Sequence, residues 1–139
     1  MDELTRKAYE LRRDIIEEIY RSKAGHVGGD LSVVDILTVL YYRVMNVSPE
    51  NFSSPDRDRF LLSKGHCVDA LYMVLGDRGF FDKQEAIETF SAYGSKFIGH
   101  PNTEINGIEI NSGSLGHGLA VGVGMAIAGK MDKKDYRTY

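Results

Sequence analysis

The most distinctive stretch of this 139-residue chain is Asp58-Arg59-Phe60-Leu61-Leu62-Ser63-Lys64-Gly65-His66. Its apolar run, residues 60–62, predicts a short buried strand, because a brief apolar segment that ends in turn residues is typical of a strand inside a core. Residues 63–66 predict a small-residue turn at the carboxyl end of that strand, and a helix from about Cys67 to Leu75 follows. The stretch therefore predicts a strand, a turn and a helix in direct succession.

Two helices are predicted before this stretch. The first carries one apolar stripe at spacings of three and four residues, with charges on the opposite side, and should stop at Gly25. The stripe consists of Leu4, Ala8, Leu11, Ile15 and Ile19. The second helix should begin at the capping box Ser32-Val33-Val34-Asp35 and run to about Met45. Because its body is apolar on most faces, we expect it to be buried between neighbouring elements.

The remaining elements follow from turn and capping signals. Residues 46–58 are rich in Ser, Pro, Asn and Asp and predict a surface loop. A second capping box at residues 82–85 predicts a helix through Phe90 that ends before Gly94. Residues 136–139, Tyr-Arg-Thr-Tyr, resemble the start of a further strand. Since no repeat or linker interrupts the chain, we expect one domain over residues 1–139.

Composition restricts the classes of function. Hydrophobic residues make up 42% and charged residues 27% of the chain, which is typical of a soluble globular domain. Seventeen scattered Lys and Arg are outnumbered by twenty Asp and Glu, so nucleic acid is not an expected partner. The longest weakly polar stretch, residues 115–129, is too short to span a bilayer. With a single cysteine and an acidic start, Met1-Asp2-Glu3, that does not resemble a signal peptide, we expect a cytoplasmic protein without membrane contact.

The four histidines, His26, His66, His100 and His117, each follow a glycine. Glycine accounts for 15 of 139 residues, so chance would give this arrangement in roughly one sequence in ten thousand. Glycine lets the backbone approach a ligand closely, and imidazole can donate, accept or shuttle protons near neutral pH. The pattern predicts a polar pocket, with the first three histidines as the stronger candidates. For His117, a structural role ranks above a catalytic one.

Other interpretations of the histidines are weaker. A zinc site would be indicated by histidines at helical spacing or by an adjoining cysteine pair, and the sequence has neither. A serine-protease-like triad would be indicated by the pattern G-x-S-x-G, and no serine here has it. An ordinary hydrogen-bonded role remains the main alternative for any single histidine.

Residues 111–118, Asn-Ser-Gly-Ser-Leu-Gly-His-Gly, predict a glycine-rich turn that leads into a helix. Backbone amides at such a helix start favour an anionic group such as a phosphate. The nicotinamide fingerprint G-x-G-x-x-G is absent, because Val121 stands at the position of its last glycine. On the following helix Gly118, Gly122 and Ala126 lie four residues apart, and this small-residue face fits tight packing within the domain as well as a subunit or cofactor contact.

Together these motifs resemble the N-terminal part of transketolase, over nearly the whole chain. The matching stretches are Lys23-Ala24-Gly25-His26-Val27-Gly28-Gly29, residues 58–66, Gly99-His100-Pro101 and Gly113-Ser114-Leu115-Gly116-His117-Gly118-Leu119. The resemblance implies an α/β fold, the diphosphate-binding domain of thiamine diphosphate enzymes, with a parallel sheet flanked by helices and cut short at the C-terminus. It also implies an activity: transfer of a two-carbon ketol unit from a ketose donor to an aldose acceptor through thiamine diphosphate.

The resemblance assigns roles to individual residues. His26 would help to bind the substrate and move protons, and His100 would hydrogen-bond the donor ketose near its reacting carbon. The residues expected at the cofactor are His66, Ser114, Leu115 and Gly116, the last three largely through backbone groups. Neutral imidazoles would stabilise alkoxide charge and relay protons during the reaction.

Departures from the family pattern favour its split, two-gene branch. Residues 27–29 and Ser114 stand where many full-length transketolases have proline-containing variants, and His117 replaces a common glutamine. The Gly-Asp-Gly…Asn motif that holds Mg²⁺ would begin just beyond Tyr139, so no metal ligand is expected within the chain. We therefore expect a protein that is inactive alone and that acts on sugar phosphates with a C-terminal partner subunit. Homodimerisation through the N-terminal subunit would make the assembly a heterotetramer.

Two further interpretations stay open. The chain could be a non-catalytic truncated remnant or an assembly protein that retains the fold. It could also be a thiamine diphosphate enzyme of the deoxyxylulose-phosphate synthase type, although residues 63–66 favour transketolase.

Overall fold

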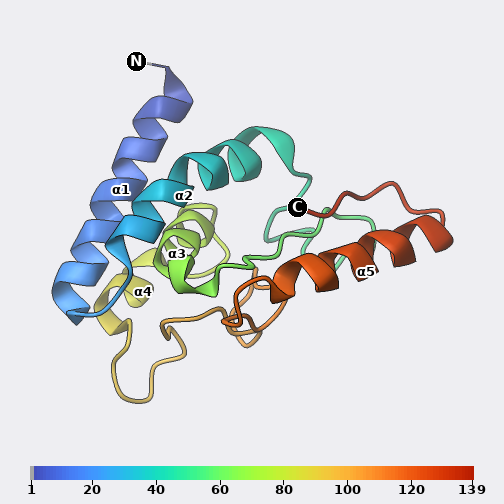
Figure 1. Ribbon diagram of the computed structural model, residues 1–139. Coiled ribbons are helices and arrows are strands. Elements are labelled where there is room, and N and C mark those ends of the chain that lie inside the picture. The colour runs from blue at the N-terminus through green and yellow to red at the C-terminus, as the bar shows by residue number, and fades with distance from the viewer. Residues whose placement is uncertain (1) are drawn as a thin grey trace.

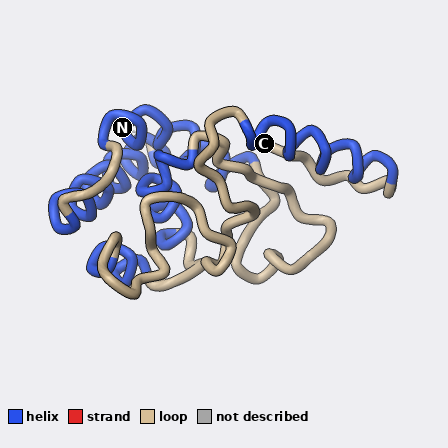
Figure 2. Tube along the Cα trace, turned by 60° about the horizontal axis from the view of Figure 1, so that its bottom comes forward, coloured by secondary structure: helices blue, strands red, loops and turns tan. Residues whose placement is uncertain are grey.

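The computed structural model describes residues 2–139 and shows a helical body from which the last helix extends (Figure 1). The body contains α1 (Glu3–Ser22), α2 (Val27–Val39), α3 (Val68–Asp77) and α4 (Lys83–Thr89), and α5 (His117–Met131) lies outside it. A π-helical segment, η1 (Leu40–Val44), extends α2, and a 3₁₀ turn, η2 (Gly65–Cys67), leads into α3. Long loops connect the body with α5 (Figure 2).

The core of the body forms around α3. Every residue from Val68 to Leu75 is buried, because α1, α2 and α4 all pack against this helix. Leu11 and Ile15 of α1 are fully buried, as are Val34 and Leu37 of α2. A helix that is apolar on most of its faces is stable in such surroundings, since water does not reach residues 68–75.

Most of the predicted boundaries are confirmed. α1 begins after Asp2, whose side chain caps the helix, and ends at Ser22, shortly before the expected stop. The Asp82 carboxylate caps α4 by accepting a hydrogen bond of 2.9 Å from the N–H of Gln84. The helix expected after the distinctive stretch is α3, and residues 46–58 form turns without helix or strand.

The predicted start of α2 at Ser32 is wrong. The helix begins five residues earlier, at Val27, with His26 as its N-cap residue, so Ser32 lies inside it. Glycine at residues 28 and 29 does not interrupt the helix, and at residue 29 it permits close packing. A Cβ atom at Gly29 would lie 2.6 Å from the Sγ of Cys67, so the contact between α2 and η2 requires glycine here.

The expected burial of this helix is confirmed only in part. Val34 and Leu37 are buried, but Ile36 is 59% exposed and Val39 is 44% exposed. Within residues 2–139, therefore, one apolar face of α2 has no cover.

The predicted strand at residues 60–62 is not present as a strand. Among residues 2–139 the backbone forms a single parallel β bridge, between Arg59 and Thr138, in place of a sheet. The N–H of Arg59 donates to the carbonyl of Arg137 (2.8 Å), and the N–H of Tyr139 donates back to Arg59 (2.9 Å). The two predicted strand segments thus lie side by side in parallel, but their pairing reaches only to residue 139 and is too short to count as a strand. The flanked parallel sheet stays a prediction.

α5 packs against the rest of the chain through its small residues. A Cβ atom at Gly118 would lie 2.6 Å from the Cβ of Ser63, and one at Gly122 would lie 3.5 Å from the Cγ2 of Thr138. These contacts favour packing within the domain as the reason for the small-residue face. The exposed apolar residues of this segment are Leu115, Leu119, Val123, Ile127 and Met131. No helix within residues 2–139 has both the length and the apolarity to cross a bilayer.

Candidate active site

Three of the four histidines meet at one place. The ring centroids of His26 and His66 lie 5.1 Å apart, and those of His66 and His100 lie 4.6 Å apart, both pairs edge to face. His26 is the N-cap residue of α2, His66 lies in η2, and His100 lies in the loop between α4 and α5. Residues far apart in the sequence therefore form one imidazole cluster, as the sequence predicted.

His66 is the central ring of this cluster. Its Nδ1 atom is buried and has no hydrogen-bond partner within residues 2–139. An unpaired buried nitrogen is unfavourable in a folded protein, so it indicates a position where a ligand or water completes the hydrogen bond. Burial lowers the pKa of His100, and the neighbouring His66 and His26 rings lower it further. The neutral form of His100, which can accept a proton, is therefore favoured.

The glycine-rich turn lies against the same cluster. A Cβ atom at Gly113 would lie 3.0 Å from the Cδ2 of His100, so the turn approaches the ring as closely as glycine permits. A Cβ atom at Gly65 would lie 2.8 Å from the Oγ of Ser112, and this hydroxyl donates to the carbonyl of Leu62 over 2.6 Å. The glycine-rich turn therefore packs against, and is hydrogen-bonded to, the segment that carries His66. The turn and the histidine motifs thus lie at the same place in the fold.

Residues 114–116 follow Gly113 and are exposed. Gly116 adopts a left-handed conformation (φ 87°) and is the N-cap residue of α5, whose first turn has no side-chain cap. Uncapped N–H groups at a helix start favour an anion. His117, the first residue of α5, is exposed and is not one of the stacked rings.

The loop that carries His100 is held by α3. The Tyr72 hydroxyl lies within hydrogen-bond distance of the carbonyl oxygens of Ile98 (3.1 Å) and His100 (3.2 Å), between which it shares its proton. Tyr72 itself is fully buried. The position of the third imidazole therefore depends on a side chain from the core.

Sequence reasoning missed a set of three buried carboxyl groups, Glu18, Asp30 and Asp69, which we call the acid trio. They come from α1, α2 and α3, and each side chain is 0% exposed. Burial raises the pKa of Glu18 to about 10 and that of Asp69 to about 7, and like charges within the trio act in the same direction. Burial also raises the pKa of Asp30, although the N–H groups of Ala70 and His26 oppose this.

Two signals could have revealed the acid trio. Glu18 lies three residues after Ile15 on the apolar stripe of α1, so helical spacing alone places its carboxyl group in the core. Asp69 interrupts an otherwise apolar run from residue 67 to residue 75. A carboxyl group on a buried face without a cation nearby is unusual enough to need an explanation.

Metal binding is not indicated by these side chains. Within residues 2–139, no group of three or more His, Cys, Asp or Glu side chains is arranged to hold a metal ion. Imidazole rings can donate, accept and transfer protons near neutral pH.

Comparison with known proteins gives a family match over almost the whole chain. Residues 5–138 match the family described as "Transketolase, thiamine diphosphate binding domain". The chain is 53% identical over 128 residues to an apulose-4-phosphate transketolase subunit of Phocaeicola vulgatus, a match that covers 92% of this chain and 45% of the relative. It is 40% identical over 131 residues to the 6-deoxy-6-sulfo-D-fructose transketolase subunit SqwG of a Clostridium species. This match covers 94% of this chain and 47% of the relative. The chain thus spans about half the length of these relatives.

Solved structures show the same similarity. The transketolase of Campylobacter jejuni superposes with a TM-score of 0.92 at 33% identity, over 100% of this chain and 23% of that one. The transketolase of Leishmania mexicana superposes with a TM-score of 0.90 at 29% identity, over 100% of this chain and 22% of that one. The whole chain therefore shares its fold with part of these larger proteins.

Proposed function

This chain belongs to the transketolase family, and from that membership we propose that it is the cofactor-binding subunit of a transketolase that acts with a partner subunit. The observation that carries this proposal is the convergence of His26, His66 and His100 beside the glycine-rich turn. In this arrangement three imidazole rings from separate segments lie together beside one turn.

The residues present fit thiamine diphosphate. The unpaired Nδ1 of His66 offers a hydrogen-bond position, and residues 114–116 are exposed before the uncapped start of α5, where an anionic group is favoured. We assign His66, Ser114, Leu115 and Gly116 to the cofactor. When bound, the cofactor supplies a nucleophilic carbon that takes up the two-carbon unit of a ketose. The ligands of Mg²⁺ are proposed to lie outside residues 1–139.

We assign the proton-transfer steps to His26 and His100. The neutral ring of His100 is suited to accept a hydrogen bond, and then a proton, from a hydroxyl group of the donor sugar. His26 is exposed, so we propose that its ring contacts the sugar and returns a proton to the acceptor. Holding both rings against His66 lets them act on neighbouring atoms of one substrate.

The relatives support our proposals for a partner protein and a substrate class. Two relatives are named subunits of transketolases, and this chain spans only about half of each. The exposed apolar residues of α2 and α5 are consistent with further contacts, for which we propose a second copy of this chain and a C-terminal transketolase subunit. The higher identity is to the relative named for apulose 4-phosphate, so we place the donor among phosphorylated ketoses.

The test is a titration of the assembled protein with thiamine diphosphate and Mg²⁺ by calorimetry. The complete product of the gene that encodes this chain is produced together with a C-terminal transketolase subunit from the same genome, and the product without that subunit serves as the control. We expect saturable binding by the assembly and transfer of a two-carbon unit from a ketose phosphate to an aldose. Absence of heat from the assembly, at cofactor concentrations that saturate a known transketolase, would refute the proposal.

A further inference from the structure

Asp30 connects the starts of two helices that carry histidines. It lies in the first turn of α2, four residues after His26, and its own N–H donates to the His26 carbonyl over 3.1 Å. Its Oδ1 atom accepts a hydrogen bond of 3.1 Å from the N–H of Ala70, in the first turn of α3 and four residues after His66. One side chain therefore links the segment of His26 to the segment of His66.

The surroundings show that this link is unusual. Asp30 is 0% exposed, and its Oδ2 atom has no hydrogen-bond partner within residues 2–139. The other two members of the acid trio are also buried carboxyl groups. The groups that favour the ionised form of Asp30 are the backbone N–H groups of Ala70 and His26 and the charges of His26 and Lys64. A buried carboxylate with so few partners costs stability compared with an apolar residue of similar size. Asp30 therefore contributes to the structure through its hydrogen bond between α2 and α3, because its burial itself does not stabilise the fold.

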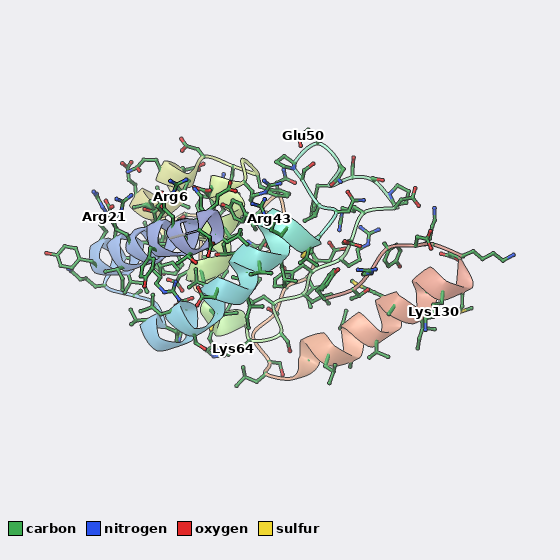
Figure 3. The ribbon with its side chains drawn as sticks, turned by 90° about the horizontal axis from the view of Figure 1, so that it is seen from above. Arg6, Arg21, Arg43, Glu50, Lys64 and Lys130 are labelled. Carbon is green, nitrogen blue, oxygen red and sulfur yellow. The ribbon has the colours of Figure 1, made fainter. Side chains whose placement is uncertain are left out.

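The packing around Asp30 leaves little freedom for the two segments. A Cβ atom at Gly29 would lie 2.6 Å from the Sγ of Cys67 and 3.8 Å from the Nζ of Lys64, so α2 begins in direct contact with η2. Lys64 is labelled beside the start of α2 in Figure 3. Close contact prevents the segments from moving nearer to each other, and the hydrogen bond to Ala70 prevents them from sliding past each other.

We propose that Asp30 is a positioning residue that fixes the separation of the His26 and His66 rings by joining α2 to α3. Within residues 2–139 no hydrogen bond joins this side chain to either ring, so it acts through the backbone that carries them. The effect on catalysis rests on the proposed function, whereas the effect on geometry is a property of the chain itself.

Three variants test the proposal. Asp30→Ala removes the acceptor for the Ala70 N–H, whereas Asp30→Asn keeps a side-chain oxygen in nearly the same place. Asp35→Asn is the matched control, because Asp35 lies on the same helix but is exposed and paired with Arg12 over 2.6 Å. Hydrogen exchange of the Ala70 amide and nuclear Overhauser contacts between the two imidazoles are measured by NMR. Donor turnover and cofactor affinity are measured in the assembled protein.

We expect Asp30→Ala to speed exchange of the Ala70 amide at least tenfold, to weaken the contacts between the rings, and to lower kcat for the donor at least tenfold. Cofactor affinity should change less than threefold. Asp30→Asn should restore kcat to within threefold of the wild type, and Asp35→Asn should match the wild type throughout. This rescue by the isosteric variant separates positioning from a general loss of structure.

Several outcomes would overturn the proposal. The first is an unchanged exchange rate of the Ala70 amide in Asp30→Ala. The second is a loss of kcat in Asp30→Asn as large as that in Asp30→Ala. The third is a loss of kcat of that size in the control Asp35→Asn. If Asp30→Ala does not fold, the test uses the wild-type chain. The measurement is then the NMR scalar coupling across the hydrogen bond, between the Ala70 nitrogen and the Asp30 carboxyl carbon. Absence of this coupling would contradict the proposed link. If the wild-type assembly transfers no two-carbon unit, the proposed function fails while the NMR measurements still decide the positioning role.

Discussion

Replacing Glu18 with glutamine is expected to stabilise the folded chain above neutral pH. Both carboxyl oxygens of Glu18 are buried without a hydrogen-bond partner in the described part of the chain. Burial, together with the charges of Asp69 and Asp30, raises the pKa of Glu18 to about 10 from an ordinary value of 4.5. Glutamine has nearly the same shape and carries no charge, so it removes the titration and leaves the packing in place.

The sign and size of the effect follow from proton linkage. Between the two pKa values the folded chain keeps a proton that the unfolded chain has released. The contribution of Glu18 to stability is therefore present in full below pH 4.5 and declines as the pH rises toward 10. At pH 7, which is about 2.5 pH units above the unfolded value, the decline amounts to about 3 kcal/mol.

Urea unfolding followed by circular dichroism measures this effect between about pH 8 and pH 9, above the pKa of about 7 of Asp69, so that Asp69 contributes less to the slope there. The free energy of unfolding of the wild type should fall more steeply than that of Glu18→Gln, by about 1.4 kcal/mol per pH unit, the value for one proton. Glu17→Gln is the matched control: Glu17 is half exposed and paired with Arg21, and its loss should cost less than about 1 kcal/mol at every pH. Equal slopes for Glu18→Gln and the wild type would refute the reasoning.

Three further predictions concern the site and its supports. His100→Ala should lower donor turnover in the assembly more than tenfold and leave cofactor affinity nearly intact, because we assign His100 to the substrate; calorimetry showing an equal loss of cofactor affinity would reassign it. Gly118→Ala should destabilise the chain by about 1–3 kcal/mol in thermal unfolding, since its Cβ atom would lie 2.6 Å from Ser63. Gly124→Ala, with no atom within 4 Å, should instead gain up to about 1 kcal/mol, and equal effects of the two would contradict the packing argument. Tyr72→Phe should cost about 1 kcal/mol in urea unfolding through the lost hydrogen bond to the loop of His100, and an unchanged midpoint would show that this bond is dispensable.

The sequence predicted the imidazole cluster because the evidence for it is local. Each histidine lies in a short motif, and the motifs matched one family in order, so their convergence could be expected without knowing the packing. The start of α2 could not be predicted in the same way. Gly28 and Gly29 look like helix breakers when read locally, and only the contact of Gly29 with Cys67 shows why glycine is required inside this helix.

The sheet and the acid trio depend on partners that are distant in sequence. Arg59 and Thr138 are the bridged residues, and nothing near residue 59 indicates whether a strand partner will be long enough to complete a ladder. The burial of Glu18 and Asp69 likewise depends on three helices packing together, although Glu18 lies at helical spacing from Ile15 and Asp69 interrupts an apolar run. Local patterns therefore predict helices and motifs better than they predict which polar groups the fold will bury.

The glycine before each histidine does not have one physical cause. Gly25 has a positive φ of 133°, and a Cβ atom there would lie 2.7 Å from the Oδ1 of Asp69, so both conformation and space require glycine. Gly65 is required by its contact with Ser112, and Gly116 by its left-handed conformation. Gly99 has neither feature: its φ is not positive, and a Cβ atom would meet nothing within 4 Å. If a bound ligand approaches the backbone near His100, this is the glycine where a side chain would obstruct it, so Gly99→Ala should weaken ligand binding in the assembly without lowering the thermal stability of the free chain.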